Sequence, residues 1–429
     1  MAMRYRLVPS FLASLYLLFW LVNRRNGPSS PSDTSTPENV FPVSAYHEPG
    51  GKMVRVFFLK HIAAHPDVYC YFVNSLQGGL RLTSTGRRRM FSKSGYPFHF
   101  DALEEYKGKY RGYTAYCPAV PDIQHVGDRN RLFILLHIEP GSRTFQLPVQ
   151  TGRISENSYA HTKHRISMCM TPWFKTETFD PRFIVEYIEM QRAMGVTQMV
   201  VYLAENPDPK VKRVLSAYNR REKPFGATNN RMFEIKLVNW VFPIENASNT
   251  TWYFDQVLSF NDCLHRIGNE TQHIFFGDFD EVLVPDQSLP ARYGALPTWN
   301  DVIDTAQNSS WYEDTPTICF PSYYFPPPVE NNFLEKSIFD RTNSTVETYP
   351  ERKKCLVRPG DVEEVYVHWP RKPANFRIGE DLAVIFHYRV CLRKDYNPCP
   401  PDTRYAPNHR LNAYRNLIKN SVAMRLSSL

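Results

Sequence analysis

The alternation of strand-like and helix-like segments between residues 165 and 276 constrains the fold more than any other feature. Short apolar runs, typical of buried strands, alternate with amphipathic segments that have helical spacing. This repetition predicts an α/β fold with a doubly wound, mostly parallel sheet and helices on both faces. The expected strands are 166–170, 196–203, 232–240 and 272–276, and the expected helices are 181–194, 209–218 and 252–267.

Three carboxylates, Asp278, Asp280 and Glu281, follow the last of these strands within four residues. Carboxylates are rarely buried without a cation nearby, and ligands of open α/β sheets bind outside the carboxyl ends of the strands. Oxygen ligands there suit Mg²⁺ or Mn²⁺, which in turn suit a diphosphate. We therefore interpret 278–280 as the Asp-x-Asp element of a nucleotide-sugar transferase. In the alternative, structural interpretation, the carboxylates cap the next turn or helix.

Composition excludes several other classes of protein. The chain has 429 residues, enough for two domains or for one large domain with additions. Its net charge of +8 is dispersed, and the only tight basic run, 87–89, is expected to be a solvated face, so we expect no nucleic-acid partner. The sequence contains no zinc-type cysteine spacing, P-loop or Gly-x-Gly-x-x-Gly motif.

The N-terminal region predicts a membrane anchor. Residues 7–22 form an almost uninterrupted apolar run flanked by arginines, just long enough to cross a bilayer after a cytosolic tail of residues 1–6. A cleaved signal peptide is the competing interpretation, but no Ala-x-Ala-type site follows the run. Residues 23–50 are rich in Pro, Ser and Thr and predict a disordered stem. We expect a β-rich accessory domain over 51–155 and a catalytic domain over 160–425.

Cysteines and glycosylation sequons favour a lumenal C-terminal part. An even number of cysteines spread along the chain is typical of an oxidising compartment, although the sequence does not give their connectivity. The eight cysteines are Cys70, Cys117, Cys169, Cys263, Cys319, Cys355, Cys391 and Cys399, and the sequon asparagines are Asn246, Asn249, Asn269, Asn308 and Asn343. We therefore expect a single-pass type II membrane protein.

Four segments, in order, resemble glycosyltransferase family 92 across residues 165–414. They are Cys169-Met170-Thr171-Pro172-Trp173-Phe174, Phe183-Ile184-Val185-Glu186-Tyr187 with Gly195-Val196, Phe276-Gly277-Asp278-Phe279-Asp280-Glu281, and His387-Tyr388-Arg389. The resemblance implies a GT-A type fold, UDP-galactose as donor, Mn²⁺ as cofactor and an inverting β-1,4 transfer in the Golgi membrane. The implied acceptors are glycan termini of glycoproteins, such as core fucose or β-galactose. Nothing in the sequence distinguishes these acceptors, and a homodimer is one arrangement that it leaves open.

The expected metal site centres on the Asp-x-Asp element. Asp280 is our first choice as a direct ligand, and Asp278 is expected to bind the ribose or a metal-bound water. Glu281 either supports these groups or is a solvated turn residue. A third ligand is expected from His368, near the end of a strand predicted over 363–369, or from His387, near the end of one predicted over 383–388. A histidine in such a place is nevertheless more often packed or hydrogen-bonded.

Donor and acceptor groups are less sharply indicated. We assign Thr171, Pro172, Asp278 and Arg389 to donor binding, with Arg389 suited to a phosphate. One-step inversion needs a general base, and Glu313, Asp314, Glu335 and Asp340 follow the Asp-x-Asp element at suitable intervals. The sequence does not choose among these four, and Glu335 and Asp340 are retained with Asp278 and Asp280 as catalytic residues. Five aromatic residues are candidates for sugar stacking or for core packing: Trp311, Tyr323, Tyr324, Phe325 and Trp369.

A second class of function competes with catalysis. The chain could be an inactive, carbohydrate-binding homologue in the secretory pathway, in which 278–281 form a structural Ca²⁺ loop. Such a loop needs more oxygen ligands than this segment provides. Donor hydrolysis separates the two functions.

Overall fold

The computed structural model describes most of the chain after residue 39. The described residues are 40–48, 52–64, 67–76, 79–82, 88–89, 101–102, 108–118, 132–139, 143–150, 162–173, 181–204, 208–219, 233–242, 244, 247–292, 294, 296–326, 337–389 and 402–429. Within these ranges, no helix combines the length and the hydropathy that crossing a bilayer requires. The expected tail, anchor and most of the stem lie outside them.

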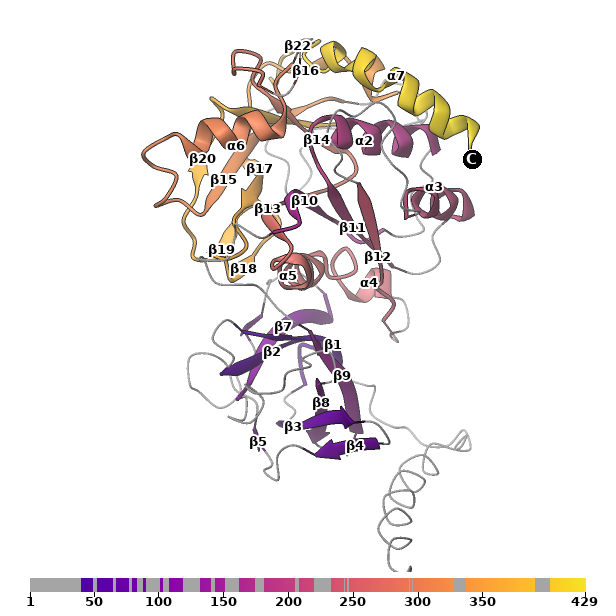
Figure 1. Cartoon of the computed structure of the whole chain (residues 1–429), viewed down its shortest axis with the longest axis vertical. Helices are drawn as coiled ribbons and strands as arrows, with labels where there is room; N and C mark the ends of the chain where they lie inside the picture. Colours follow the sequence, from indigo (N-terminus) through magenta and orange to yellow (C-terminus); the bar gives the residue numbers. More distant parts are fainter. Residues whose placement is uncertain are drawn as a thin grey trace, which may run out of the picture. The chain divides into compact units, whose positions relative to one another are not determined.

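The first part of the described chain is a curled sheet of nine strands, with the order β4-β3-β8-β9-β1-β2-β7-β6 and β5 paired to β3 (Figure 1). Alternate apolar side chains, such as Val54, Phe72 and Ile134, fill its core. The Cys70–Cys117 disulfide joins β3 to β7. The strands are β1 (Val40–His47), β2 (Met53–His61), β3 (Asp67–Leu76), β4 (Gly79–Leu82), β5 (Arg88–Arg89), β6 (Asp101–Ala102), β7 (Tyr110–Pro118), β8 (Leu132–Glu139) and β9 (Arg143–Gln150).

Strand β1 corrects the expected extent of the stem. The disordered stem was expected to continue to residue 50, but Val40–His47 pairs with both β2 and β9. Val40, Phe41 and Tyr46 are buried. These apolar side chains give the segment enough buried surface to be ordered, despite the Pro- and Ser-rich composition around it.

The second part is an α/β unit built on another nine-stranded sheet. Its order is β12-β11-β10-β13-β17-β15-β21-β14, with β20 (Arg377–Ile378) paired to β15. Its main strands are β10 (His164–Met170), β11 (Gln198–Leu203), β12 (Glu234–Asn239), β13 (Thr271–Gly277), β14 (Glu281–Pro285), β15 (Thr317–Tyr324), β17 (Tyr349–Val357) and β21 (Ala383–His387). The short strands β16 (Asn343–Thr345), β18 (Glu364–Val365), β19 (Pro370–Lys372) and β22 (Tyr405–Pro407) form two separate pairs.

The predicted parallel arrangement is complete in the first half of this sheet, whereas the second half is mixed. The strands β10 to β13 are mutually parallel. In the second half, β17 is antiparallel to both β13 and β15, and β14 is antiparallel to β21, but β15 is parallel to β20 and β21. The sheet is therefore mostly parallel, as expected, with antiparallel pairs confined to its second half. Parallel neighbours need a long crossover, usually a helix, and no α-helix is described between β15 and β17 in the residues the structure covers.

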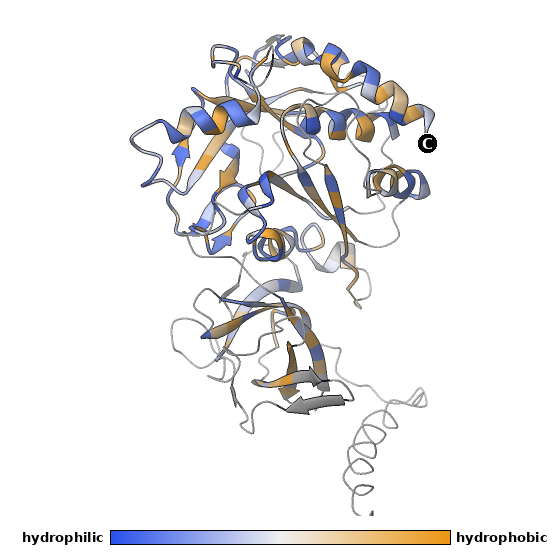
Figure 2. Ribbon diagram, viewed as in Figure 1, coloured by the Kyte–Doolittle hydropathy of each residue, from blue (hydrophilic) through white to orange (hydrophobic). Residues whose placement is uncertain are grey.

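Helices pack on both faces of the sheet, and most match the predicted segments. They are α2 (Pro181–Ala193), α3 (Pro209–Asn219), α4 (Ala247–Thr250), α5 (Gln256–Ile267), α6 (Trp299–Gln307) and α7 (Asn412–Ser427), with the 3₁₀ turn η4 (Ile338–Asp340). Helix α7 packs beside α2 (Figure 1). Both carry mixed hydrophobic and hydrophilic residues, as expected of amphipathic helices (Figure 2).

Two predicted elements are shorter than expected. The helix predicted over 252–267 begins at Gln256, because residues 253–255 have left-handed backbone angles and the Asp255 carboxylate accepts the Leu258 N–H at 3.0 Å. The strand predicted over 363–369 is reduced to β18, because the chain turns back at once and Glu364 pairs with Lys372 of β19. His368 therefore lies in the turn and not at a strand end.

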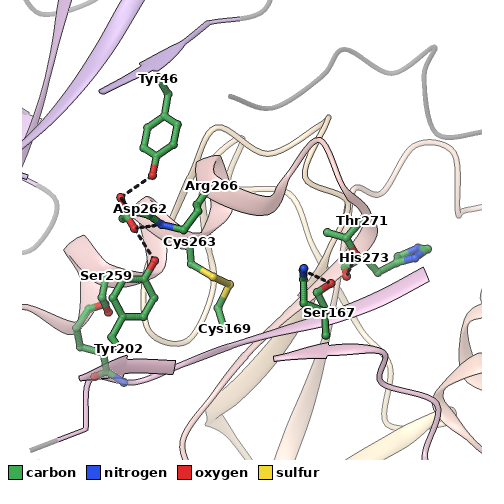
Figure 3. Close-up of a disulfide and its surroundings, with 12 residues drawn as sticks. Tyr46, Ser167, Cys169, Tyr202, Ser259, Asp262, Cys263, Arg266, Thr271 and His273 are labelled. Atoms are coloured by element: carbon green, nitrogen blue, oxygen red, sulfur yellow. Dashed lines mark hydrogen bonds and ion pairs between the residues drawn. A yellow bond between two sulfur atoms is a disulfide. The ribbon is translucent and has the colours of Figure 1, made fainter. Parts of the chain in front are cut away.

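Disulfides and a buried polar cluster connect these elements. Cys169 of β10 is bonded to Cys263 of α5 (Figure 3), and Cys319 to Cys355 across β15 and β17. Cys391 and Cys399 lie outside the described residues. Beside the first disulfide, the buried carboxylate of Asp262 accepts hydrogen bonds from Tyr46 Oη at 2.7 Å and Tyr202 Oη at 2.5 Å (Figure 3). Strand β1 is thereby bonded to helix α5.

Candidate active site

The topology gathers the expected site residues at one edge of the second sheet. Met170 lies opposite Gly277 at the carboxyl ends of β10 and β13, and Tyr324 lies opposite His387 at the carboxyl ends of β15 and β21. Glu281, the first residue of β14, also pairs with His387. Since only three residues join β13 to β14, although three strands separate them in the sheet, the sheet curls and brings both groups together.

The carboxylate of Asp278 is committed to donors from three other elements. Its Oδ1 accepts hydrogen bonds from Thr171 Oγ1, at the end of β10, and from Gln256 Nε2 of α5 at 3.0 Å. Its Oδ2 lies 3.1 Å from Lys354 Nζ of β17. Gln256 Nε2 also lies 2.7 Å from Thr171 Oγ1. Both oxygens of Asp278 are thus held in place by protein groups.

Glu281 is fully buried, so its interpretation as a solvated turn residue is wrong. Its Oε2 lies 3.2 Å from Lys354 Nζ and accepts the backbone N–H of Asp278 at 3.0 Å. Burial raises the pKa of Glu281 to about 7, with the Asp278 and Asp280 carboxylates adding to the rise and Lys354 and His387 opposing it. Glu281 therefore supports the Asp-x-Asp turn from beneath.

Asp280 has a different environment, because its side chain is 24% exposed and faces His387. The distance from Asp280 Oδ2 to His387 Nε2 is 3.6 Å, and that from Glu281 Oε1 to His387 Nδ1 is also 3.6 Å. Both are too long for a hydrogen bond. The two buried ring nitrogens and Glu281 Oε1 therefore lack hydrogen-bond partners among the described residues.

The opposite charges of His387 and Asp280 shift the pKa values of both groups. Burial opposes protonation of His387, but the carboxylates of Glu281 and Asp280 outweigh it and raise the His387 pKa. Burial likewise opposes ionisation of Asp280, but His387, followed by Arg389 and Lys354, holds its pKa below the usual value. An ionised carboxylate and an imidazole thus face each other at the edge of the sheet.

Aromatic side chains fix the turn that carries these groups. Phe279 packs between Trp173 and Tyr187, with ring centroids 4.6 Å and 5.2 Å away. The Tyr187 hydroxyl lies 3.2 Å from the carbonyl oxygens of both Asp278 and Glu281. Tyr324 stacks on His387 at 5.1 Å. The second residue of Asp-x-Asp is therefore a buried anchor that turns its two neighbours toward the edge.

The structure separates the two candidate histidines. His368 Nδ1 donates to the Lys353 carbonyl oxygen at 3.0 Å, and its Nε2 faces Arg352 Nη1 at 3.4 Å. Burial, followed by the charge of Lys354, lowers the His368 pKa well below the usual value, so the ring is neutral. Both nitrogens of His368 have partners, whereas those of His387 face the carboxylates of the Asp-x-Asp turn.

The assigned donor-binding residues meet at the same edge in part. Thr171 bonds to Asp278, and the guanidinium of Arg389 interacts with Asp280 and with Tyr253. Pro172 is buried, so its side chain does not line an open surface. The structure thus brings Thr171, Asp278 and Arg389 together and places Pro172 behind them.

Two of the four candidate general bases lie away from this edge. Glu313 and Asp314 precede the amino end of β15, at the opposite edge of the sheet, where Glu313 faces Arg358. This position argues against both as the base. Asp340 forms a surface ion pair with Arg415 of α7 at 2.6 Å. Glu335 lies outside the described residues and remains a prediction.

The aromatic candidates divide in a similar way. Tyr324 and Phe325 are buried behind the edge that carries His387, where they pack as core residues. Trp311 packs on Arg377, near the opposite edge. Tyr323 is partly buried, and Trp369 is 40% exposed in the β18–β19 turn. Only Trp369 has the exposure that sugar stacking requires.

The side chains at the Asp-x-Asp turn show whether a divalent ion fits there. No group of three or more His, Cys, Asp or Glu side chains forms a complete metal site in the part of the chain that the structure describes. The partly exposed Asp280 and the buried, unpartnered Nε2 of His387 nevertheless supply one oxygen and one nitrogen that face each other. Ions such as Mg²⁺ are usually held by one or two carboxylates together with substrate phosphates, so this incomplete set fits an ion that binds with a diphosphate.

Sequence reasoning missed Lys354 and Gln256, the two residues that hold Asp278. Lys354 directly precedes the apolar residues 355–357 of β17, and a lysine next to such a run was the available signal. Gln256 had no signal, because its role depends on where helix α5 begins.

Comparisons with known proteins cover the part of the chain that carries this site. The family model described as glycosyltransferase family 92 matches residues 164–421. The beta-1,4-galactosyltransferase galt-1 of Caenorhabditis elegans is 25% identical over 234 residues, which are 53% of this chain and 48% of that protein. The chain thus spans about half the length of this curated relative.

Solved structures resemble the chain only weakly. HddC from Yersinia pseudotuberculosis has a TM-score of 0.27 and 8% identity, covering 52% of this chain and 93% of its own. The carbohydrate binding module of the muscle glycogen-targeting subunit of protein phosphatase-1 has a TM-score of 0.16 and 11% identity, covering 34% and 81%. Neither likeness carries an argument.

Proposed function

The chain belongs to glycosyltransferase family 92, and on that premise we propose that it transfers galactose from UDP-galactose to a glycan terminus. Membership implies a nucleotide-sugar donor and a glycan acceptor. The finer proposal is an inverting β-1,4 transfer by a GT-A type domain that depends on Mn²⁺. The name of the relative, a beta-1,4-galactosyltransferase, supports the sugar and the linkage. We further propose a Golgi type II membrane protein, anchored by residues 7–22.

One observation carries the proposal: Asp280 and the unpartnered His387 Nε2 face each other at the carboxyl edge of the sheet. We assign these two residues as the protein ligands of the ion. When bound, the ion would offset the negative charge that grows on the departing diphosphate. Arg389, beside Asp280, is placed to add positive charge to the same phosphates.

The other residues of the cluster orient these groups. Asp278, held by Thr171, Gln256 and Lys354, is assigned to the ribose or to a metal-bound water. Because both of its oxygens already accept from protein donors, it is a poorer direct ligand than Asp280. The proton of the acceptor hydroxyl requires a base, and Glu335 and Asp340 stay the candidates for it.

A panel of UDP-sugars tests the proposed donor. The purified protein, assayed for UDP release, should hydrolyse UDP-galactose in preference to UDP-glucose and the UDP-N-acetylhexosamines, and chelation of Mn²⁺ should stop the reaction. Clear preference for another UDP-sugar would replace the proposed donor. Absence of turnover with every donor would favour the non-catalytic carbohydrate-binding homologue.

The two histidines give a matched pair of variants. His387→Ala should raise the Mn²⁺ concentration required for half-maximal activity by about 100-fold, because it removes a direct ligand. His368→Ala should leave that concentration within about threefold of wild type and lower the melting temperature, because it removes packing and a backbone hydrogen bond. Activity titrated with Mn²⁺ and thermal unfolding measure the two effects. The reverse pattern would make His368 the ligand.

The exposed sequons test the proposed topology. The side chains of Asn308 and Asn343 are exposed on the described surface. Expressed in the secretory pathway, the protein should lose mass on glycosidase treatment, and Asn308→Gln and Asn343→Gln should each remove one glycan. Ser310→Ala, which breaks the sequon of Asn308 but keeps the asparagine, should lose the same mass as Asn308→Gln. A glycan-free chain that protease reaches from the cytosolic side would show the opposite topology.

A further inference from the structure

Lys354 lies completely buried between two carboxylates of the site. Its side chain is 0% exposed, and its Nζ lies 3.1 Å from Asp278 Oδ2 and 3.2 Å from Glu281 Oε2. The backbone N–H of Asp278 donates to the same Glu281 oxygen at 3.0 Å, which closes a ring of three residues. Nothing in the proposed chemistry requires a lysine at this point.

The backbone of Lys354 is fixed on both sides. It lies opposite Phe320 in the pairing of β17 with β15. Its neighbour Cys355 is bonded to Cys319 of β15. The ammonium group is therefore delivered to one place beneath the Asp-x-Asp turn. Because no part of the side chain is exposed, Lys354 does not reach a substrate phosphate at the edge without a rearrangement of this sheet.

The ammonium divides the three carboxylates into two kinds. Asp278 and Glu281 each place one oxygen on Lys354, and the second oxygen of Asp278 accepts from Thr171 and Gln256. Asp280 makes no such contact and faces His387 instead. Without an internal cation, three carboxylates within four residues would repel one another, and all three would compete for a divalent ion.

We propose that Lys354 is a positioning residue, a built-in cation that commits Asp278 and Glu281 to the protein and leaves Asp280 and His387 as the metal ligands. This inference rests on the metal dependence in the proposed function. It also predicts that the turn stays ordered without an ion, since Lys354 offsets part of its negative charge.

The test compares Lys354→Met, which keeps length and loses charge, with the double variant Lys354→Met/Glu281→Gln. In EDTA, Lys354→Met should melt roughly 10 °C below wild type, because the buried carboxylate of Glu281 and the partly exposed carboxylate of Asp278 lose their partner. The double variant should recover part of that loss, because one of those charges is removed as well. If Lys354→Met melts like wild type, or if the double variant is no more stable than the single one, Lys354 is not the internal cation.

Mn²⁺ binding without nucleotide provides a readout that is independent of turnover. Electron paramagnetic resonance measures the affinity for Mn²⁺ of whichever of the two variants folds. That variant should bind Mn²⁺ about tenfold more tightly than wild type, because a carboxylate that Lys354 no longer holds becomes available to the ion. Mn²⁺ should also raise the melting temperature of Lys354→Met more than that of wild type. Unchanged affinity would overturn the proposal. If wild type binds Mn²⁺ but turns over no UDP-sugar, the proposed function fails while this inference stands.

Discussion

Asp280→Asn should reduce sugar transfer by about 100- to 1,000-fold while the protein remains folded. The substitution keeps the shape of the side chain but removes the charged oxygen that we assign to the metal, and with it much of the stabilisation of the departing diphosphate. Two effects on stability oppose each other. The repulsion between the Asp280 carboxylate and those of Asp278 and Glu281 is relieved, but the attraction of Asp280 to His387 is lost. The melting temperature should therefore change by only a few degrees, as thermal unfolding in EDTA would measure.

Asp278→Asn is the matched control for this variant. Its carboxylate is held by Thr171, Gln256 and Lys354 and is not assigned to the ion. Activity should fall, but the Mn²⁺ concentration required for half-maximal activity should change less than in Asp280→Asn. Near-normal transfer by folded Asp280→Asn protein at limiting Mn²⁺ would remove the basis of the site assignment.

Asp262→Ala should lower the free energy of unfolding by about 3–5 kcal/mol. The carboxylate is fully buried and accepts from Tyr46, Tyr202 and Arg266 (Figure 3). Removing it leaves two buried tyrosine hydroxyls without their acceptor, and each unsatisfied group costs about 1–3 kcal/mol. The melting temperature should fall by about 10 °C or more.

Tyr46→Phe provides the comparison for this buried network. It removes one donor and leaves Asp262 paired with Tyr202 and Arg266, so the loss should be about 1 kcal/mol. A melting temperature for Asp262→Ala equal to that of Tyr46→Phe would mean that the network contributes no more than a single hydrogen bond. It would then not bind strand β1 to helix α5 as described.

The parallel half of the catalytic sheet was predictable, because each strand and helix there carries its own periodic signal. The pattern over 181–194 yields α2 almost residue for residue, and the apolar run before Gly277 yields β13. The carboxylates of Asp278 and Asp280 lie at the carboxyl end of that strand, as the rule for open α/β sheets predicts.

The mixed half was not predictable in the same way, because strand direction there depends on pairing between distant segments. The pairing of β14 with β21 places His387 opposite Glu281. No local sequence pattern distinguishes His387 from His368. Glu313 and Asp314 precede the amino end of β15 and therefore lie at the opposite edge of the sheet, although their distance along the chain from the Asp-x-Asp element suited a general base.

The partners of buried charged residues were the other feature that could not be predicted from the sequence. In sequence, Lys354 resembles any other lysine of the chain, and only the folded structure shows its two carboxylate partners. Strand β1 was assigned to the stem, because the composition of its neighbours outweighed its own apolar side chains.

The central claim is that Asp280 and His387 hold the ion that accompanies the diphosphate. Crystals of the protein grown with Mn²⁺ and UDP, measured at a wavelength where manganese scatters anomalously, test it most directly. We predict one anomalous peak within coordination distance of an Asp280 carboxylate oxygen and His387 Nε2, bridged to the phosphates of UDP. A peak bound to His368, or UDP bound without any peak at Asp280, would contradict the account.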